Sequence, residues 1–204
     1  MKRIGMLLAV MTLTLPALHA QKPISQEERD FLVNNLKETR AAFFKSIEGL
    51  TPAQWTFKAG PDRWSIAECA EHIIKSETTI FGIEQGQIGK SPMPADAHFD
   101  KEHDQKVLAL VLDRSQKAQA PEVLKPSAGI ATPAEAAAAF KKSRAATIAY
   151  VTDTKDDLRA FGSPHPLLKN LDSYEWLLLL SAHSSRHTAQ IEEVKASPGY
   201  PSSK

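Results

Sequence analysis

Apolar side chains recur at intervals of three and four residues in four long stretches of the chain. In the first stretch they are Phe31, Leu32, Leu36, Ala41, Phe44 and Ile47. This spacing gathers them on one face of a helix, so each stretch is predicted to be an amphipathic helix. The four predicted helices cover residues 25–49, 65–86, 132–152 and 172–196.

Each predicted helix starts at a residue that caps helix N-termini. Ser25, Ser65 and Asp172 are each followed three residues later by a glutamate, which is the pattern of a capping box. The remaining helix starts at Thr132, with Pro133 at its first helical position. The starts of the helices are therefore indicated by capping residues as well as by the apolar spacing.

The connections contain turn-forming residues and few large apolar groups. A short helical turn is expected around residues 53–55. A long insert, residues 87–131, is expected to hold two loops and one helix over residues 100–116. Residues 162–170 are expected to be a turn-rich connection. No stretch alternates apolar and polar residues, so no β-sheet is predicted.

The first twenty residues have the pattern of a secretory signal peptide. Two basic residues precede an apolar run over residues 4–15, and Ala20 marks the expected cleavage site. The apolar run is short for a membrane span. We therefore expect residues 1–20 to be removed. Residues 21–204 are expected to form one exported domain, periplasmic or secreted, with no membrane association after cleavage.

Charge and cysteine content exclude several classes of protein. The chain of 204 residues has 25 basic and 24 acidic side chains and a formal net charge of +1. It lacks the clustered basic residues typical of nucleic-acid-binding proteins, so no nucleic-acid partner is expected. The single cysteine excludes an internal disulfide and a cysteine-rich zinc site. The seven histidines are therefore the main candidates for chemistry.

Two histidines lie on the apolar stripe of the helix predicted over residues 172–196. The stripe passes through Trp176, Leu180, His183, His187, Ile191 and Val194. His183 and His187 are one turn apart on the same face, so their ring nitrogens can share one cation. The alternative is that both are hydrogen-bonded core or surface residues, a common role for histidines at this spacing.

A third histidine lies on the helix predicted over residues 65–86. His72 belongs to a stripe of small and polar residues that includes Cys69. If this helix faces the last one, three imidazoles converge. Three neutral histidines with one open position allow a divalent metal to hold and polarise water or a substrate atom. His72, His183 and His187 are therefore candidate metal ligands.

Two motifs around these histidines resemble the DinB-like superfamily. The motifs are Trp64-Ser65-Ile66-Ala67-Glu68, followed by His72, and His183-Ser184-Ser185-Arg186-His187-Thr188-Ala189-Gln190-Ile191. Leu50-Thr51-Pro52-Ala53-Gln54-Trp55 and His165-Pro166 add to the likeness. The resemblance implies an all-α four-helix bundle with up-down-down-up helices, here with an extra loop and helix between the second and third helices. It also implies a divalent metal bound by His72, His183 and His187.

The resemblance implies metal chemistry without fixing the reaction. Members are similar to metal-dependent hydrolases or to transferases, in which a metal activates water or a thiol. Zinc or nickel is expected, and iron and manganese also suit imidazole ligands. The likeness further implies a small-molecule substrate or ligand and a homodimer. The alternative is a non-catalytic helical bundle that binds metal or a small ligand.

Other side chains near the motifs have simpler interpretations. Cys69 could supply a fourth ligand, but a lone buried cysteine usually packs as a small apolar residue. Glu68 could orient the ring of His72, although the capping box already explains its position. His165 could approach the site from its loop, but loop histidines are commonly solvated.

The insert and the tryptophans offer further candidates. His98 and His103 lie among acidic residues that could hold a cation, although a solvated acidic segment is the simpler interpretation. Trp55, Trp64 and Trp176 could line a pocket, but tryptophan most often fills a core. The H-E-x-x-H pattern of zinc proteases is absent from the sequence, which disfavours that type of proteolysis.

Overall fold

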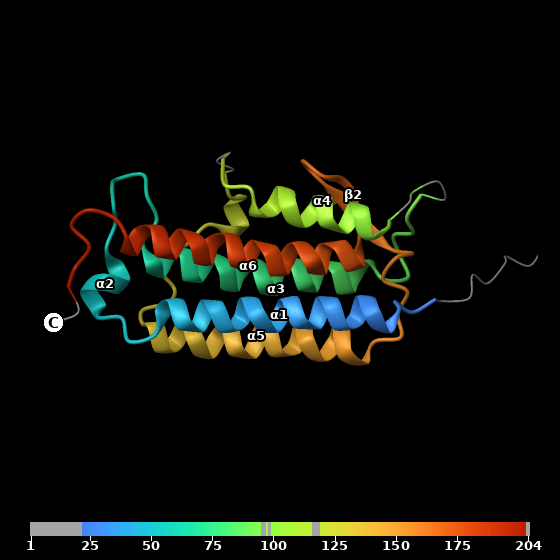
Figure 1. Ribbon diagram of the computed structural model, residues 1–204, viewed down its shortest axis with the longest axis horizontal. Coiled ribbons are helices and arrows are strands. Elements are labelled where there is room, and N and C mark those ends of the chain that lie inside the picture. The colour runs from blue at the N-terminus through green and yellow to red at the C-terminus, as the bar shows by residue number, and fades with distance from the viewer. Residues whose placement is uncertain (1–21, 95–96, 98, 116–118, 203–204) are drawn as a thin grey trace, which may run out of the picture.

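Four long helices lie side by side along the molecule in the computed structural model (Figure 1). They are α1 (Gln26–Ile47), α3 (Ile66–Gln87), α5 (Pro133–Asp153) and α6 (Ser173–Lys195). The structure describes residues 22–94, 97, 99–115 and 119–202. The predicted signal peptide, residues 1–20, and His98 of the insert lie outside the described residues.

The helices follow the topology that the resemblance implies. α1 packs against α5 and α6, and α3 packs against the same two helices. In Figure 1, α1 and α6 run in one direction, whereas α3 and α5 run in the opposite direction. The predicted all-α, up-down-down-up four-helix bundle is therefore confirmed. Because α3 and α5 are parallel neighbours, the chain between them must return along the bundle, and the insert makes this connection.

The long helices begin at the predicted capping residues. The side chains of Ser25, Ser65 and Asp172 each accept a hydrogen bond from the N–H of the glutamate three residues later. The glutamate side chain in turn accepts one from the N–H of the cap. Thr132 accepts a hydrogen bond from the N–H of Glu135 at the start of α5. Such caps satisfy N–H groups that a helix leaves unpaired and typically contribute about 1 kcal/mol.

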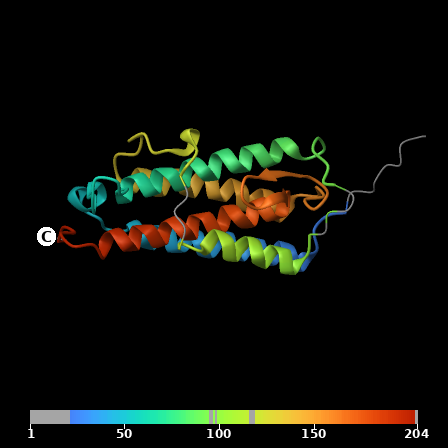
Figure 2. The same cartoon turned by 90° about the horizontal axis from the view of Figure 1, so that it is seen from above.

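Among the residues that the structure describes, three shorter helices lie between the long ones. They are α2 (Pro52–Thr56), α4 (Lys101–Leu112) and the 3-10 turn η1 (Glu122–Leu124). α4 lies on the outside of the bundle against α6 (Figure 2). It ends before residue 116 because the carboxylate of Asp113 accepts the N–H and the hydroxyl of Ser115, which turns the chain. η1 falls in a stretch that the sequence predicts to be a loop.

A small β-hairpin contradicts the prediction that no sheet is present. Its antiparallel strands are β1 (Gly162–His165) and β2 (Lys169–Asp172). Strands this short carry no alternation, and contacts with neighbouring elements hold them in place. The indole of Trp176 donates to the carbonyl of Ser163 at 3.1 Å. Only glycine fits at Gly162, because a Cβ there would lie 2.1 Å from the carbonyl oxygen of Leu171.

The buried core follows the predicted stripe of α1 only in part. Leu32 and Leu36 are fully buried, as predicted, but Ala41 is exposed. Phe43 is buried instead, because it lies two turns after Leu36 on the same face. Trp55 of α2 and Phe43 belong to the same core cluster.

No helix among the described residues is long and apolar enough to cross a membrane.

Candidate metal centre

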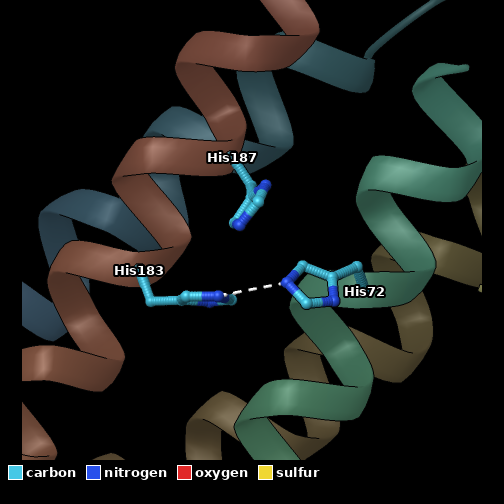
Figure 3. A group of neighbouring side chains, drawn as sticks. All are labelled: His72, His183 and His187. Carbon is cyan, nitrogen blue, oxygen red and sulfur yellow. Dashed lines mark hydrogen bonds between the residues drawn. The ribbon is translucent and has the colours of Figure 1, made fainter. Parts of the chain in front are cut away.

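His72, His183 and His187 meet between α3 and α6 (Figure 3). His72 lies in the first half of α3, whereas His183 lies at the middle of α6 and His187 one turn later. The two helices are antiparallel neighbours, so these positions come level along the bundle. The fold thus brings together the three histidines that the sequence singles out.

The three imidazole rings are close enough to share one cation. When one ring nitrogen is taken from each histidine, the three nitrogens lie within 4.8 Å of one another. Nε2 of His72 lies 3.1 Å from Nε2 of His183. Two nitrogens that each bind one tetrahedral zinc ion at about 2.0–2.1 Å lie roughly 3.3 Å apart. The closest nitrogen pair is therefore near the separation expected of two ligands on one ion.

In His72 and His187, a hydrogen bond at Nδ1 leaves Nε2 available to bind a metal. Nδ1 of His72 lies 2.8 Å from the carbonyl oxygen of Leu124, and Nδ1 of His187 lies 2.8 Å from Oε1 of Gln190. Both oxygens only accept, so each Nδ1 carries the proton and donates it. Nε2 of each ring is therefore free of a proton. Metal-binding histidines are held in the same way by a second hydrogen bond.

His183 completes the donor set. Its Nδ1 is buried and has no hydrogen-bond partner in the part of the chain that the structure describes. Because Nε2 of His72 can only accept, Nε2 of His183 must donate its proton across the 3.1 Å contact. His183 would bind a shared cation through Nε2 in its other neutral tautomer, in which the proton lies on Nδ1, and Nε2 would then be a third ligand. The donor chemistry of the three residues therefore fits a metal site.

Burial keeps the three imidazoles neutral. It lowers the pKa of His183 well below its usual range, and charge on His187 or His72 would act in the same direction. Burial, followed by the charge of His72, lowers the pKa of His187 to about 3. Burial also lowers the pKa of His72, while its hydrogen bond to the Leu124 carbonyl opposes the shift. Neutral imidazole is the form that binds a metal, so the centre is ready for a cation near neutral pH.

Trp64 packs against the centre. Its ring centre lies 4.9 Å from that of His72 and 5.9 Å from that of His187. Of the other two tryptophans, Trp55 fills the core and Trp176 supports the hairpin. Trp64 thus gives the centre an apolar neighbour, and apolar surroundings strengthen electrostatic interactions by lowering the local dielectric constant.

Two partners of the centre have roles that the sequence did not predict. Gln190 lies three residues after His187, a spacing that places two side chains together on a helix. That spacing is a signal that could have identified it. Leu124 acts through its backbone carbonyl, and every residue has one, so no residue type could indicate this role.

Cys69 is an apolar core residue, and Glu68 is a helix-capping residue. Cys69 packs in the core, where burial raises the pKa of its thiol to about 12. It is not part of the ligand cluster found among the described residues. Glu68 accepts the N–H of Ser65 at 2.7 Å and pairs with Lys58 at the same distance. Glu68 is therefore a capping residue of α3.

His165 and His103 contact other partners. Nδ1 of His165 accepts two backbone N–H groups of the hairpin turn, and its ring packs on Trp176. Nδ1 of His103 contacts the carboxylate of Glu175 near the start of α6. These contacts hold the hairpin and the insert against the bundle, so neither histidine joins the centre.

Comparisons with known proteins agree with the fold. The chain matches the DinB superfamily over residues 35–191, a range that contains all three histidines. It is 24% identical over 158 residues to the uncharacterized protein YuaE of Bacillus subtilis (strain 168), covering 78% of this chain and 93% of YuaE. It also resembles the solved structure of YfiT from Bacillus subtilis, described as a probable metal-dependent hydrolase with an unusual four-helix bundle topology. That likeness has a TM-score of 0.59 and 20% sequence identity over 89% of this chain and 94% of YfiT. This chain belongs to the DinB superfamily.

Proposed function

We propose that this protein is a metal-dependent hydrolase whose divalent cation is held by His72, His183 and His187. The observation that carries the proposal is the meeting of three neutral imidazoles from two helices at one point. Three histidines fill three positions of a four-coordinate cation and leave one open, as in catalytic zinc sites. The likeness to YfiT, described as a probable metal-dependent hydrolase, supports the same class.

The residues of the chain prepare the site for this chemistry. When bound, the cation supplies Lewis acidity to water or to a substrate atom. The Leu124 carbonyl and the Gln190 amide fix the rings of His72 and His187 with Nε2 unprotonated. Zinc or nickel is the proposed metal, because imidazole is a suitable ligand for both. A transferase that uses a thiol in place of water would need the same three ligands.

The alternative is a helical bundle that binds metal or a small ligand without catalysis. Both functions require the three histidines, and they differ in the remaining coordination position. A catalytic site keeps this position open to exchange, whereas a structural site is closed.

Cobalt(II) is a probe that separates these two functions. Metal-free protein is loaded with one equivalent of cobalt, and its visible absorption is recorded before and after the addition of azide. We expect azide to shift the absorption bands, because the open position accepts the anion. Unchanged bands would show a closed site and favour the non-catalytic alternative. His183→Ala is the control and is expected to lose the bands.

We also propose that residues 1–20 direct export of the protein. The basic start, the apolar run and Ala20 support this. Expression with these residues in a bacterium, followed by mass spectrometry of the periplasmic fraction, is expected to find a chain that begins at Gln21. An intact chain in the cytoplasm would contradict export. The homodimer that the family resemblance implies is also a proposal, and light scattering of the purified protein tests it.

A further inference from the structure

A surface segment of the insert lies over α3 beside His72. This strap, residues 122–129, begins with η1, which contacts α3 and lies next to it in Figure 2. The carbonyl of Leu124 in the strap accepts the Nδ1 proton of His72 at 2.8 Å. A backbone group of the insert therefore holds one of the three histidines.

Apolar burial contributes little to holding the strap. Val123 is 69% exposed, and Glu122, Lys125 and Ser127 are also exposed. A segment that removes little apolar surface from water gains little stability from the hydrophobic effect. Polar contacts with α3 therefore contribute to the position of the strap.

Two charged residues of α3 supply these contacts. Oε1 of Glu71 accepts the N–H and the hydroxyl of Ser127 at 2.9 and 2.8 Å, and Oε2 accepts the N–H of Gly129 at 3.1 Å. Lys75 donates to the carbonyl of Lys125 at 2.8 Å and to the hydroxyl of Ser127 at 2.9 Å. Lys75 also pairs with Glu71 at 2.9 Å. We call Glu71 and Lys75 the clamp.

The clamp and the strap are matched to each other. Glu71 is 4% exposed, and a buried carboxylate is unfavourable unless donors surround it. The strap provides three of those donors. Ala128 has a left-handed backbone with φ of 60°, which is uncommon for a residue with a Cβ.

We propose that Glu71 and Lys75 are positioning residues of the metal centre, acting through the strap on His72. By holding the Leu124 carbonyl against Nδ1, the clamp keeps the proton on that nitrogen and leaves Nε2 for the metal. Outer hydrogen-bond partners of this kind set the orientation and the tautomer of histidine ligands. The inference rests on the proposed metal site and gives this part of the insert a function.

Zinc affinity of Glu71→Gln tests the proposal, with Glu68→Gln as the matched control. Both variants replace a glutamate of α3, but Glu68 contacts Ser65 and Lys58 instead of the strap. Affinity is measured by competition with a chelator. Glu71→Gln is expected to bind zinc about 10- to 100-fold more weakly than the wild type. Glu68→Gln is expected to bind like the wild type. Equal affinity of Glu71→Gln and the wild type would overturn the proposal.

Nuclear magnetic resonance of the metal-free protein gives a second readout. The chemical shifts of the imidazole nitrogens show which one carries the proton. We expect Nδ1 of His72 to be protonated in the wild type and the two tautomers to be mixed in Glu71→Gln. A pure Nδ1–H form in both proteins would overturn the proposal.

These measurements distinguish the failure of the proposed function from the failure of the clamp. If the wild type binds no zinc, the metal site fails, yet the tautomer of His72 still tests the clamp. If Glu71→Gln does not fold, Ser127→Ala replaces it in both measurements. Ser127 is exposed, and its hydroxyl contacts both clamp residues. A smaller change in the same direction is expected. No change in affinity or tautomer would overturn the proposal.

Discussion

Arg144 and Glu77 form a bidentate ion pair inside the bundle. Nε and Nη2 of Arg144 each lie 2.8 Å from a carboxylate oxygen of Glu77, and the two side chains are 0% and 1% exposed. Thr147 donates to the same carboxylate at 2.7 Å, and Arg144 donates to the hydroxyl of Ser184 at 2.6 Å. Arg144 also donates to the hydroxyl of Thr39 in α1 at 2.7 Å. Ser184 follows His183 in α6, so this network connects the four long helices next to the candidate metal centre.

Removal of one partner of this ion pair is expected to destabilise the fold strongly. Arg144→Met leaves the carboxylate of Glu77 buried without a counter-charge, which typically costs about 3–5 kcal/mol of unfolding free energy. Urea denaturation measures this loss. The double variant Arg144→Met/Glu77→Leu is expected to recover much of it, because both charges are then absent. A single variant as stable as the wild type would contradict the role of the pair.

Gln190 is expected to influence metal affinity more than folding. It is half-buried on α6, and its amide oxygen accepts the Nδ1 proton of His187. Gln190→Ala is expected to weaken zinc binding about tenfold or more, with a urea midpoint close to that of the wild type. Gln190→Glu retains an acceptor and is expected to bind zinc more tightly than Gln190→Ala. Zinc affinity that is the same in all three proteins would show that this hydrogen bond has no role.

The metal-free protein is expected to lose stability as the pH falls below about 6.5. That is the pKa of histidine in an unfolded chain, whereas the pKa of folded His187 is about 3 and that of His183 is also well below its usual value. Between these values the unfolded chain binds protons that the folded protein does not. The unfolding free energy therefore decreases by up to about 1.4 kcal/mol per pH unit for each such histidine. Above pH 7 both states are neutral at these residues, and they contribute no pH dependence.

Urea denaturation over a series of pH values checks this dependence. His187→Ala removes one of the groups and is expected to show a shallower loss of stability between about pH 6 and pH 4. The other titrating groups remain in the variant. The difference between the two proteins in the slope of unfolding free energy against pH therefore reports the protonation of His187. Identical slopes would show that His187 is not held neutral in the folded protein.

Arg159 is expected to anchor the insert helix to the bundle. Its guanidinium lies 2.9 Å from Glu28 of α1, 2.7 Å from Asp104 of α4 and 2.9 Å from Asp172 at the start of α6. Arg159→Met leaves two buried carboxylates without this cation, so we expect faster proteolysis within the insert. Lys101→Met is the control, because its ion pair is exposed and contributes little. Equal proteolysis of Arg159→Met and the wild type would contradict this anchoring role.

The helices of this protein could be predicted because their signals are local. The pairs Ser65–Glu68 and Asp172–Glu175 lie within one helical turn and set the starts of α3 and α6. The spacing of three and four residues was enough to place the histidines of α6 on a buried face. Their meeting with His72 depends on the antiparallel packing of two helices, which the family resemblance implied.

The features that could not be predicted depend on contacts between distant parts of the chain. Arg144 and Glu77 are separated by 67 positions, and in the sequence both resemble ordinary surface charges of a helix. The hairpin is held by its neighbours, such as Trp176, rather than by a strand pattern. The strap acts on His72 through the carbonyl of Leu124, which a pattern of side chains does not reveal.

Anomalous X-ray scattering at the zinc edge tests the metal site most directly, using crystals of tag-free protein reconstituted with one equivalent of zinc. We predict one strong peak at about 2.0–2.1 Å from a nitrogen of each of His72, His183 and His187. No peak at these rings, or a peak at other residues, would contradict the shared metal site.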